Sequence, residues 1–167
     1  MSARITLGID PGYGRMGYAV LVGDVGSERL IDVGCIETSK DDTQAVRLSR
    51  IALELRRLFD THKPTCLAIE TLFFTNNKTT GLAVAEARGV VLAIAGAFAV
   101  EIKEFGPKQV KLAVTGNGAA DKRQVQEMVK RLLKLESVPK PDDAADAVAV
   151  ALAGIVSEAC QNGFILL

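Results

Sequence analysis

The sequence has few of the residues from which thiolate sites and disulfide-stapled folds are built. Its 167 residues include three cysteines, one histidine and no tryptophan. Cys35, Cys66 and Cys160 are widely spaced and form no Cys-x-x-Cys or Cys/His pattern. Their odd number argues against a disulfide framework, so a reducing compartment fits this usage, and Cys66 is expected to be a core residue. The single histidine, His62, is predicted to lie near a helix end as a surface or C-cap residue.

An excess of charge of one sign is also lacking. Twenty basic and twenty acidic residues give a net charge of zero, so the overall charge does not indicate a nucleic-acid partner. Attraction to phosphate would have to come from a local basic face. The longest uncharged stretch, 89–100, is too short to span a bilayer, and residues 1–4 lack a signal-peptide apolar region. We therefore expect a cytoplasmic protein without a membrane partner, folded as a single domain over residues 1–167.

Apolar periodicity predicts an α/β fold. Three strands joined by short turns come first, and strands alternating with helices follow, which indicates a five-stranded mixed sheet flanked by helices on both faces. The predicted strands are 4–10, 16–23, 29–37, 65–70 and 100–105, and the predicted helices are 43–60, 78–98, 107–114, 121–135 and 142–160.

Four carboxylates stand at the edges of apolar runs. Asp10 ends the first strand and Glu70 ends the fourth, while Asp143 and Asp146 lie one turn apart at the start of the last helix. Sites in open α/β sheets are built at the carboxyl ends of strands. Converging carboxylates are costly to bury unless they hold cations. The pattern therefore favours a site for divalent metal, of the kind that cuts phosphodiesters.

Each of these acids also has a structural interpretation. Asp10 begins an Asp-Pro-Gly sequence, and Asp is common in such turns. Asp143 and Asp146 are well placed to complement the helix dipole, and Asp142 is expected to do only that. Glu70 is harder to explain without a partner, because it follows a buried strand.

Aromatic and basic residues near these acids are candidates for contact with nucleic acid. Phe73 and Phe74 enter a polar loop directly after Glu70, and they are either core and edge residues or a wedge that stacks on bases. Lys122 follows Asp121 at a helix start, where backbone N–H groups favour phosphate. Exposed lysines are ordinary, so solvation alone is the alternative for each basic residue. The basic candidates are Lys78, Lys108, Lys111, Lys122 and Arg123.

Residues 81–100, most of which belong to the predicted helix 78–98, are apolar and rich in small residues, among them Ala85, Ala93, Gly96 and Ala97. Such a helix either belongs entirely to the core or admits a second helix closely. We favour dimerisation partly through this helix.

Several motifs occur in one order along the chain, and together they resemble the RuvC family of bacterial Holliday junction resolvases over nearly all 167 residues. The resemblance implies a ribonuclease H-like fold and a homodimeric, metal-dependent endonuclease. It would nick two strands of a four-way DNA junction symmetrically in homologous recombination and DNA repair, with the junction-binding and branch-migration proteins RuvA and RuvB as partners. The motifs are Gly8-Ile9-Asp10-Pro11-Gly12, Ile69-Glu70, Ala87-Arg88-Gly89-Val90, Gln109-Val110-Lys111 and Asp143-Ala144-Ala145-Asp146-Ala147.

The resemblance also assigns roles to individual residues. Asp10, Glu70, Asp143 and Asp146 match the family's catalytic acids and would hold two Mg²⁺ ions, with Mn²⁺ as an expected substitute. Lys111 and Lys122 match positions that contact DNA near the scissile bond and are counted with the catalytic residues. Phe73 matches the family's stacking aromatic.

Three other functional classes remain open at this point. A related ribonuclease H-like nuclease acting on structured RNA would keep the acids. A phosphotransferase of the actin and sugar-kinase type also has an Asp-x-Gly turn after its first strand, but it needs two large domains, for which this chain is too short. A non-catalytic junction-binding module would have no need of four acids.

Overall fold

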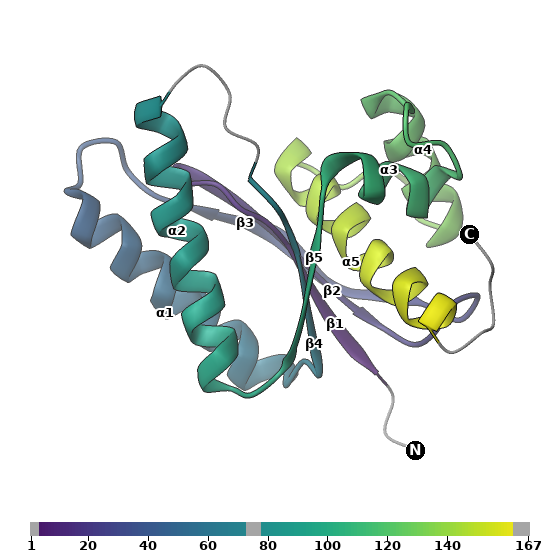
Figure 1. Cartoon of the computed structure of the whole chain (residues 1–167), viewed down its shortest axis with the longest axis horizontal. Helices are drawn as coiled ribbons and strands as arrows, with labels where there is room; N and C mark the ends of the chain where they lie inside the picture. The colour runs from purple at the N-terminus through teal and green to yellow at the C-terminus, as the bar shows by residue number, and fades with distance from the viewer. Residues whose placement is uncertain (1–3, 73–77, 162–167) are drawn as a thin grey trace.

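The structure is a computed structural model that describes residues 4–72 and 78–161. Its sheet has the strand order β3-β2-β1-β4-β5 (Figure 1). β1 pairs with β2, and β2 with β3, in the antiparallel sense, whereas β1–β4 and β4–β5 are parallel. The mixed five-stranded sheet is thus as predicted. The strands are β1 (Ile5–Asp10), β2 (Arg15–Val22), β3 (Arg29–Glu37), β4 (Cys66–Glu70) and β5 (Glu101–Phe105).

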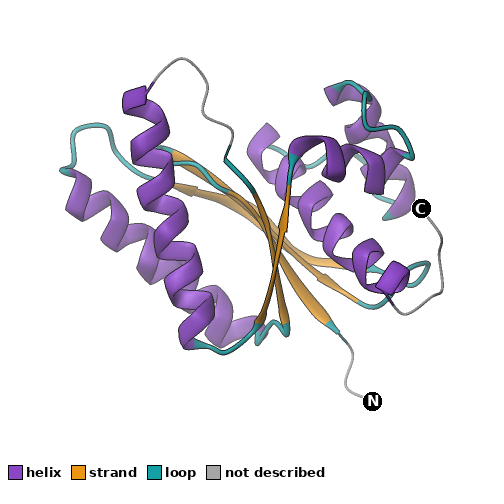
Figure 2. Cartoon of the chain, viewed as in Figure 1, coloured by secondary structure: helices purple, strands orange, loops and turns teal. Residues whose placement is uncertain are grey.

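Helices cover both faces of this sheet, which confirms the predicted layers (Figures 1 and 2). On one face, Leu7 and Ile9 pack with residues of the first two helices such as Ile51 and Val91. On the other face, Ala19 packs with the last three helices. The first pair is α1 (Gln44–His62) and α2 (Lys78–Ala97), and the other three are α3 (Pro107–Thr115), α4 (Lys122–Leu132) and α5 (Asp142–Gln161).

The ends of the elements agree with the sequence prediction to within a few residues, and α4 differs most. It ends at Leu132, whereas the apolar periodicity of the sequence predicts a helix up to residue 135. Lys134 adopts a left-handed conformation with φ of 52°, which an α-helix cannot continue through. The apolar spacing continued past this point because Leu133 and Leu135 still pack on the core.

Parallel pairing places the first two acids side by side. Ile9 of β1 is in register with Ile69 of β4, and Asp10 and Glu70 come one residue later on each strand. The two carboxylates therefore leave the sheet at the same edge, although sixty residues separate them in sequence.

Two glycines of the strands allow α5 to pack directly on the sheet. A Cβ built at Gly17 of β2 would lie 1.9 Å from the carbonyl oxygen of Asp143, and one at Gly8 of β1 would lie 2.4 Å from that of Ala147. Only residues without a Cβ allow so close an approach between a strand and a helix. This packing fixes the start of α5, and with it Asp143 and Asp146, close above the strand that ends in Asp10.

Two smaller predictions have clear outcomes. Cys66 is fully buried, as expected of a core residue. His62 is the last residue of α1, but it is neither a free surface residue nor the C-cap, which is Lys63. Its Nε2 lies 2.8 Å from Oδ2 of Asp32 on β3, so it joins the helix end to the sheet.

No helix in the part of the chain that the structure describes has the length and apolar character needed to cross a membrane.

Candidate active site

The predicted acids converge where β1 and β4 end beneath the start of α5. Glu70 and Asp146 line a hollow of about 210 Å³ together with Lys111 of α3 and Lys122 of α4. Apolar side chains, among them Val110 and Val125, form the rest of its wall. We call this the active-site hollow. Four secondary-structure elements thus bring two acids and two lysines to one cavity, and all four residues were predicted from the sequence.

Electrostatics show that the acids act on one another. The pKa of Asp10 is raised to about 7, first by burial and then by repulsion from Glu70, Asp146 and Asp143. Burial also raises the pKa of Glu70, with repulsion from Asp146 adding to it and Lys111 opposing it. The pKa of Asp146 is raised by burial as well, against the attraction of Lys122. The cluster is therefore short of positive charge.

Two basic side chains neutralise part of the cluster. Nζ of Lys122 lies 3.1 Å from Oδ2 of Asp146 and 3.3 Å from Oδ2 of Asp142. Nε of Arg15 lies 3.1 Å from Oδ2 of Asp143. Asp142 therefore does more than complement the helix dipole, because it shares Lys122 with Asp146. Sequence reasoning missed Arg15, since only the packing of β2 against α5 brings it to Asp143.

A capping box holds Lys122 at the site. Asp121 is the N-cap of α4, and its Oδ1 accepts a hydrogen bond from the backbone N–H of Gln124 at 2.8 Å. Oε1 of Gln124 accepts one in return from the backbone N–H of Asp121, also at 2.8 Å. This reciprocal pair fixes where α4 begins and so where Lys122 leaves the helix.

The carboxylates can be tested as ligands for a divalent cation. Among the described residues, no three Asp, Glu, His or Cys side chains lie close enough together to hold an ion as they stand. Lys122 and Arg15 contact Asp146 and Asp143 in this arrangement instead. The donor set itself fits, because it offers only carboxylate oxygens, which hard divalent cations prefer. Burial first, and then repulsion among the acids, raises the pKa values of Asp10 and Asp146, and a bound cation would favour their ionised forms.

Arg88 of α2 supports the end of β4. Its Nε donates to the backbone carbonyl of Glu70 at 3.4 Å, and its Nη2 pairs with Glu104 of β5. The backbone N–H of Thr71 also donates to the carbonyl of Phe105 at 2.8 Å. These bonds hold the chain around Glu70 in place. The sequence motif contains Arg88, but only the structure shows what it touches.

The remaining candidates lie away from this hollow or outside the described residues. Lys108 and Arg123 are exposed on α3 and α4 and do not line it. Phe73 and Phe74 fall in a segment outside the described residues, and the position of the Lys78 side chain is not described either.

Comparison with known proteins bears on this site directly. The sequence model of the family described as crossover junction endodeoxyribonuclease RuvC matches residues 6–154. The protein of that name from Roseiflexus sp. (strain RS-1) is 49% identical over 152 residues, which cover 91% of this chain and 90% of the relative. The one from Petrotoga mobilis is 50% identical over 147 residues, which cover 88% of this chain and 90% of the relative.

Solved structures agree with these relatives. T. thermophilus RuvC, solved in complex with a Holliday junction substrate, has a TM-score of 0.85 and 30% identity, covering 96% of this chain and 97% of its own. The yeast mitochondrial Holliday junction resolvase has a TM-score of 0.71 at 14% identity, which shows a shared fold alone. The match of the family model over most of the sequence, together with relatives near 50% identity, shows that this chain belongs to the RuvC family of crossover junction endodeoxyribonucleases.

Proposed function

We propose that this chain resolves four-way DNA junctions by nicking two strands symmetrically, as an endodeoxyribonuclease of homologous recombination and DNA repair. The observation that carries the proposal is the convergence of Asp10, Glu70 and Asp146 at one edge of the sheet in a chain of the RuvC family. The T. thermophilus relative in complex with a junction substrate supports the choice of DNA. No feature of the described residues favours the alternative, a nuclease for structured RNA.

Membership of this family implies dependence on a divalent metal, and we propose that Asp10, Glu70, Asp143 and Asp146 hold two Mg²⁺ ions, with Mn²⁺ as a substitute. Such ions, when bound, activate water and neutralise charge on the phosphate that is cut. Because burial and repulsion from the neighbouring acids raise the pKa of Asp10 to about 7, its carboxylate must lose a proton in the neutral range to become a ligand.

Lys111 and Lys122 would place positive charge at the scissile phosphate, since both line the active-site hollow with Glu70 and Asp146. Lys108 and Arg123 are proposed to contact phosphate next to it. We propose that Phe73 and Phe74 stack on bases at the junction centre and that Lys78 contacts phosphate. Phe73, Phe74 and the side chain of Lys78 lie beyond what the structure describes.

A homodimer would provide the two active sites that symmetric nicking needs. The exposed face of α2 supports this, because its residues recur at alternating intervals of four and three, the spacing of a helix-packing seam. A Cβ added at Gly89 or Gly96 would meet nothing within 4 Å in one chain, so a second helix has room to approach. The seam consists of Leu82, Glu86, Gly89, Ala93 and Gly96.

We also propose three features that the family resemblance suggests. The chain acts as a single nuclease domain, it works in the cytoplasm, and it meets its substrate with the junction-binding and branch-migration proteins RuvA and RuvB.

The decisive experiment incubates the protein with a synthetic four-way junction and with a matched linear duplex, each with and without Mg²⁺. We expect paired nicks in the junction only, and only with metal. Asp10→Asn, Glu70→Gln and Asp146→Asn should each abolish nicking while junction binding survives, because phosphate contacts elsewhere supply most of the affinity. Asp41→Asn, at an exposed turn before α1, is the matched control and should cut normally.

Near-normal turnover by any of the three variants would reject that residue as a ligand. Competition between junction DNA and a structured RNA tests the alternative, and preferential cutting of the RNA would overturn the choice of substrate.

A further inference from the structure

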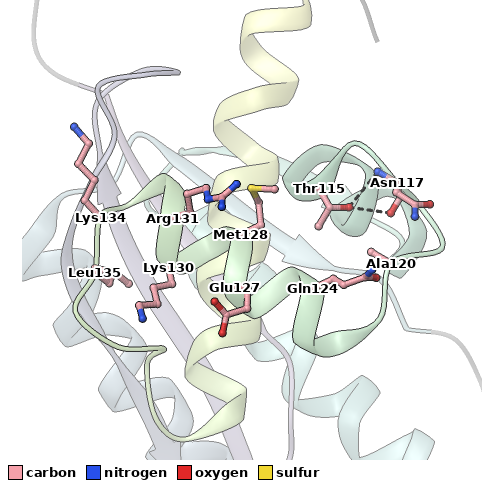
Figure 3. Close-up of a pocket in the computed structure, with 10 residues that line it drawn as sticks. All are labelled: Thr115, Asn117, Ala120, Gln124, Glu127, Met128, Lys130, Arg131, Lys134 and Leu135. Carbon is pink, nitrogen blue, oxygen red and sulfur yellow. Dashed lines mark hydrogen bonds between the residues drawn. The ribbon is translucent and has the colours of Figure 1, made fainter.

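A second hollow lies on α4 and shares no lining residue with the active-site hollow. It measures about 710 Å³ and runs along the outer side of the helix from the α3–α4 loop to the segment after Leu132 (Figure 3). Thr115 and Asn117 line one end and are hydrogen-bonded to each other. Lys130 and Lys134 lie towards the other end, as Figure 3 shows. We call this the distal hollow.

Positive charge is concentrated along this helix although the whole chain is neutral. From Lys122 to Lys134 there are five basic residues and one acidic residue, Glu127. Three of the basic residues, Lys130, Arg131 and Lys134, line the distal hollow. None of these three takes part in an ion pair with another residue of the described ranges. Their charge is therefore available to an outside anion.

The chain turns at Lys134, directly after α4, through a backbone conformation that is unfavourable for lysine. Lys134 has a φ of 52°, in the left-handed region that favours glycine over any residue with a Cβ. The turn is closed by the backbone N–H of Leu135, which donates to the carbonyl of Lys130 at 2.9 Å. Met128 and Leu135 pack on the core beneath it.

From these observations we propose that the distal hollow binds backbone phosphates of a DNA duplex that extends from the active site. The inference rests on the proposed function. α4 begins with Lys122 in the active-site hollow, and its 11 residues span roughly 16 Å at 1.5 Å per residue. For a duplex that runs along α4 and advances about 3.4 Å per base pair, the far end of the helix lies about five base pairs from a phosphate held at Lys122. The helix α4 would thus hold two phosphate contacts, one at Lys122 and one in the distal hollow, at a fixed separation along one duplex arm of the junction.

The test compares the wild type with Lys130→Gln/Lys134→Gly, measuring junction affinity over a range of salt concentrations. Glutamine keeps most of the stem of Lys130, and glycine suits the left-handed backbone, so the melting temperature should stay the same or rise. Losing two phosphate contacts should lower the slope of log K against log salt by about 2. The variant's deficit in affinity should shrink about tenfold between 50 and 200 mM salt. Arg50→Ala/Arg56→Ala, which removes two exposed charges from α1 on the other face of the sheet, is the matched control.

A second measurement locates the contact on the DNA. Junctions carry neutral methylphosphonates four to seven nucleotides from the cleavage site, on either side in turn. We expect the wild type to lose affinity on one of these substrates and the Lys130→Gln/Lys134→Gly variant, which keeps Arg131, to lose clearly less. A variant with the wild-type slope, or one as sensitive to methylphosphonates as the wild type, would overturn the proposal and turn attention to an acidic protein partner. Failure of the wild type to cut junctions would instead overturn the proposed function.

Discussion

Replacing Asp10 by Asn should stabilise the metal-free protein while abolishing its activity. The folded state keeps the Asp10 proton up to a pKa of about 7, whereas an unfolded chain releases it near 3.8. Between these values the folded state binds more protons, so the free energy of unfolding falls as pH rises. Each unit of difference between the folded and unfolded pKa corresponds to about 1.4 kcal/mol, so the ionised Asp10 lowers the free energy of unfolding by roughly 4 kcal/mol above pH 7.

The assay is urea unfolding of the wild type and Asp10→Asn in the presence of a chelator, from pH 4 to pH 8.5. Since an amide also loses hydration when buried, we expect the variant to gain about 2 to 4 kcal/mol at pH 8 and almost nothing at pH 4. For a chain of this length that is roughly 5 to 15 °C in melting temperature. Adding Mg²⁺ should restore stability to the wild type and do less for the variant.

Two results would refute this reasoning. Equal stability of both proteins at pH 8 would mean that Asp10 is not held in a repulsive, desolvated site. A gain of the same size at pH 4 and pH 8 would assign the effect to packing rather than to charge. Asp41→Asn makes the same chemical change at an exposed turn and should show no dependence on pH.

Three other changes test the placement of the site. Gly17→Ala puts a Cβ 1.9 Å from the Asp143 carbonyl oxygen, so it should cost about 1–3 kcal/mol in thermal unfolding and reduce nicking more than junction binding. The Cβ that Gly96→Ala adds meets nothing within 4 Å in one chain, so the substitution should stabilise α2 of the monomer by up to about 1 kcal/mol. The same Cβ would lie in the proposed contact between two copies of α2, so sedimentation should show a weaker dimer. Lys111→Ala should lower the salt slope of junction binding by about 1, and an unchanged slope would place Lys111 off the DNA.

Local sequence patterns were sufficient to predict the layers of this fold and the edge at which its acids meet. The apolar run before Asp10 and the one before Glu70 predict buried strands, and the alternation of strands with helices after the third strand predicts a mixed sheet. Once β1 and β4 are parallel neighbours, both acids must leave the sheet on the same side. These predictions succeeded because each depends on spacing within one segment or on general rules of strand connection.

Contacts between distant segments could not be predicted in the same way. Nothing near Arg15 in the sequence indicates Asp143, and nothing near Gly17 indicates that a helix carbonyl will rest against it. Both follow from the exact position of α5 over β2, which depends on side-chain volumes across the whole layer. The turn at Lys134 was missed for a different reason, since its apolar neighbours continue the helical period after the helix has ended.

The carboxylates of this site stay close to one another only because the surrounding structure holds them there. Lys122 neutralises Asp146 in part and Arg15 pairs with Asp143, whereas Asp10 forms no ion pair within the described residues and has its pKa raised to about 7. Repulsion of this kind would separate carboxylates on flexible segments. Here Asp10 ends a strand paired on both sides, and α5 cannot lift away without exposing the apolar residues beneath it. The free energy of packing in the sheet and its helices is therefore what keeps the acids ready to bind cations.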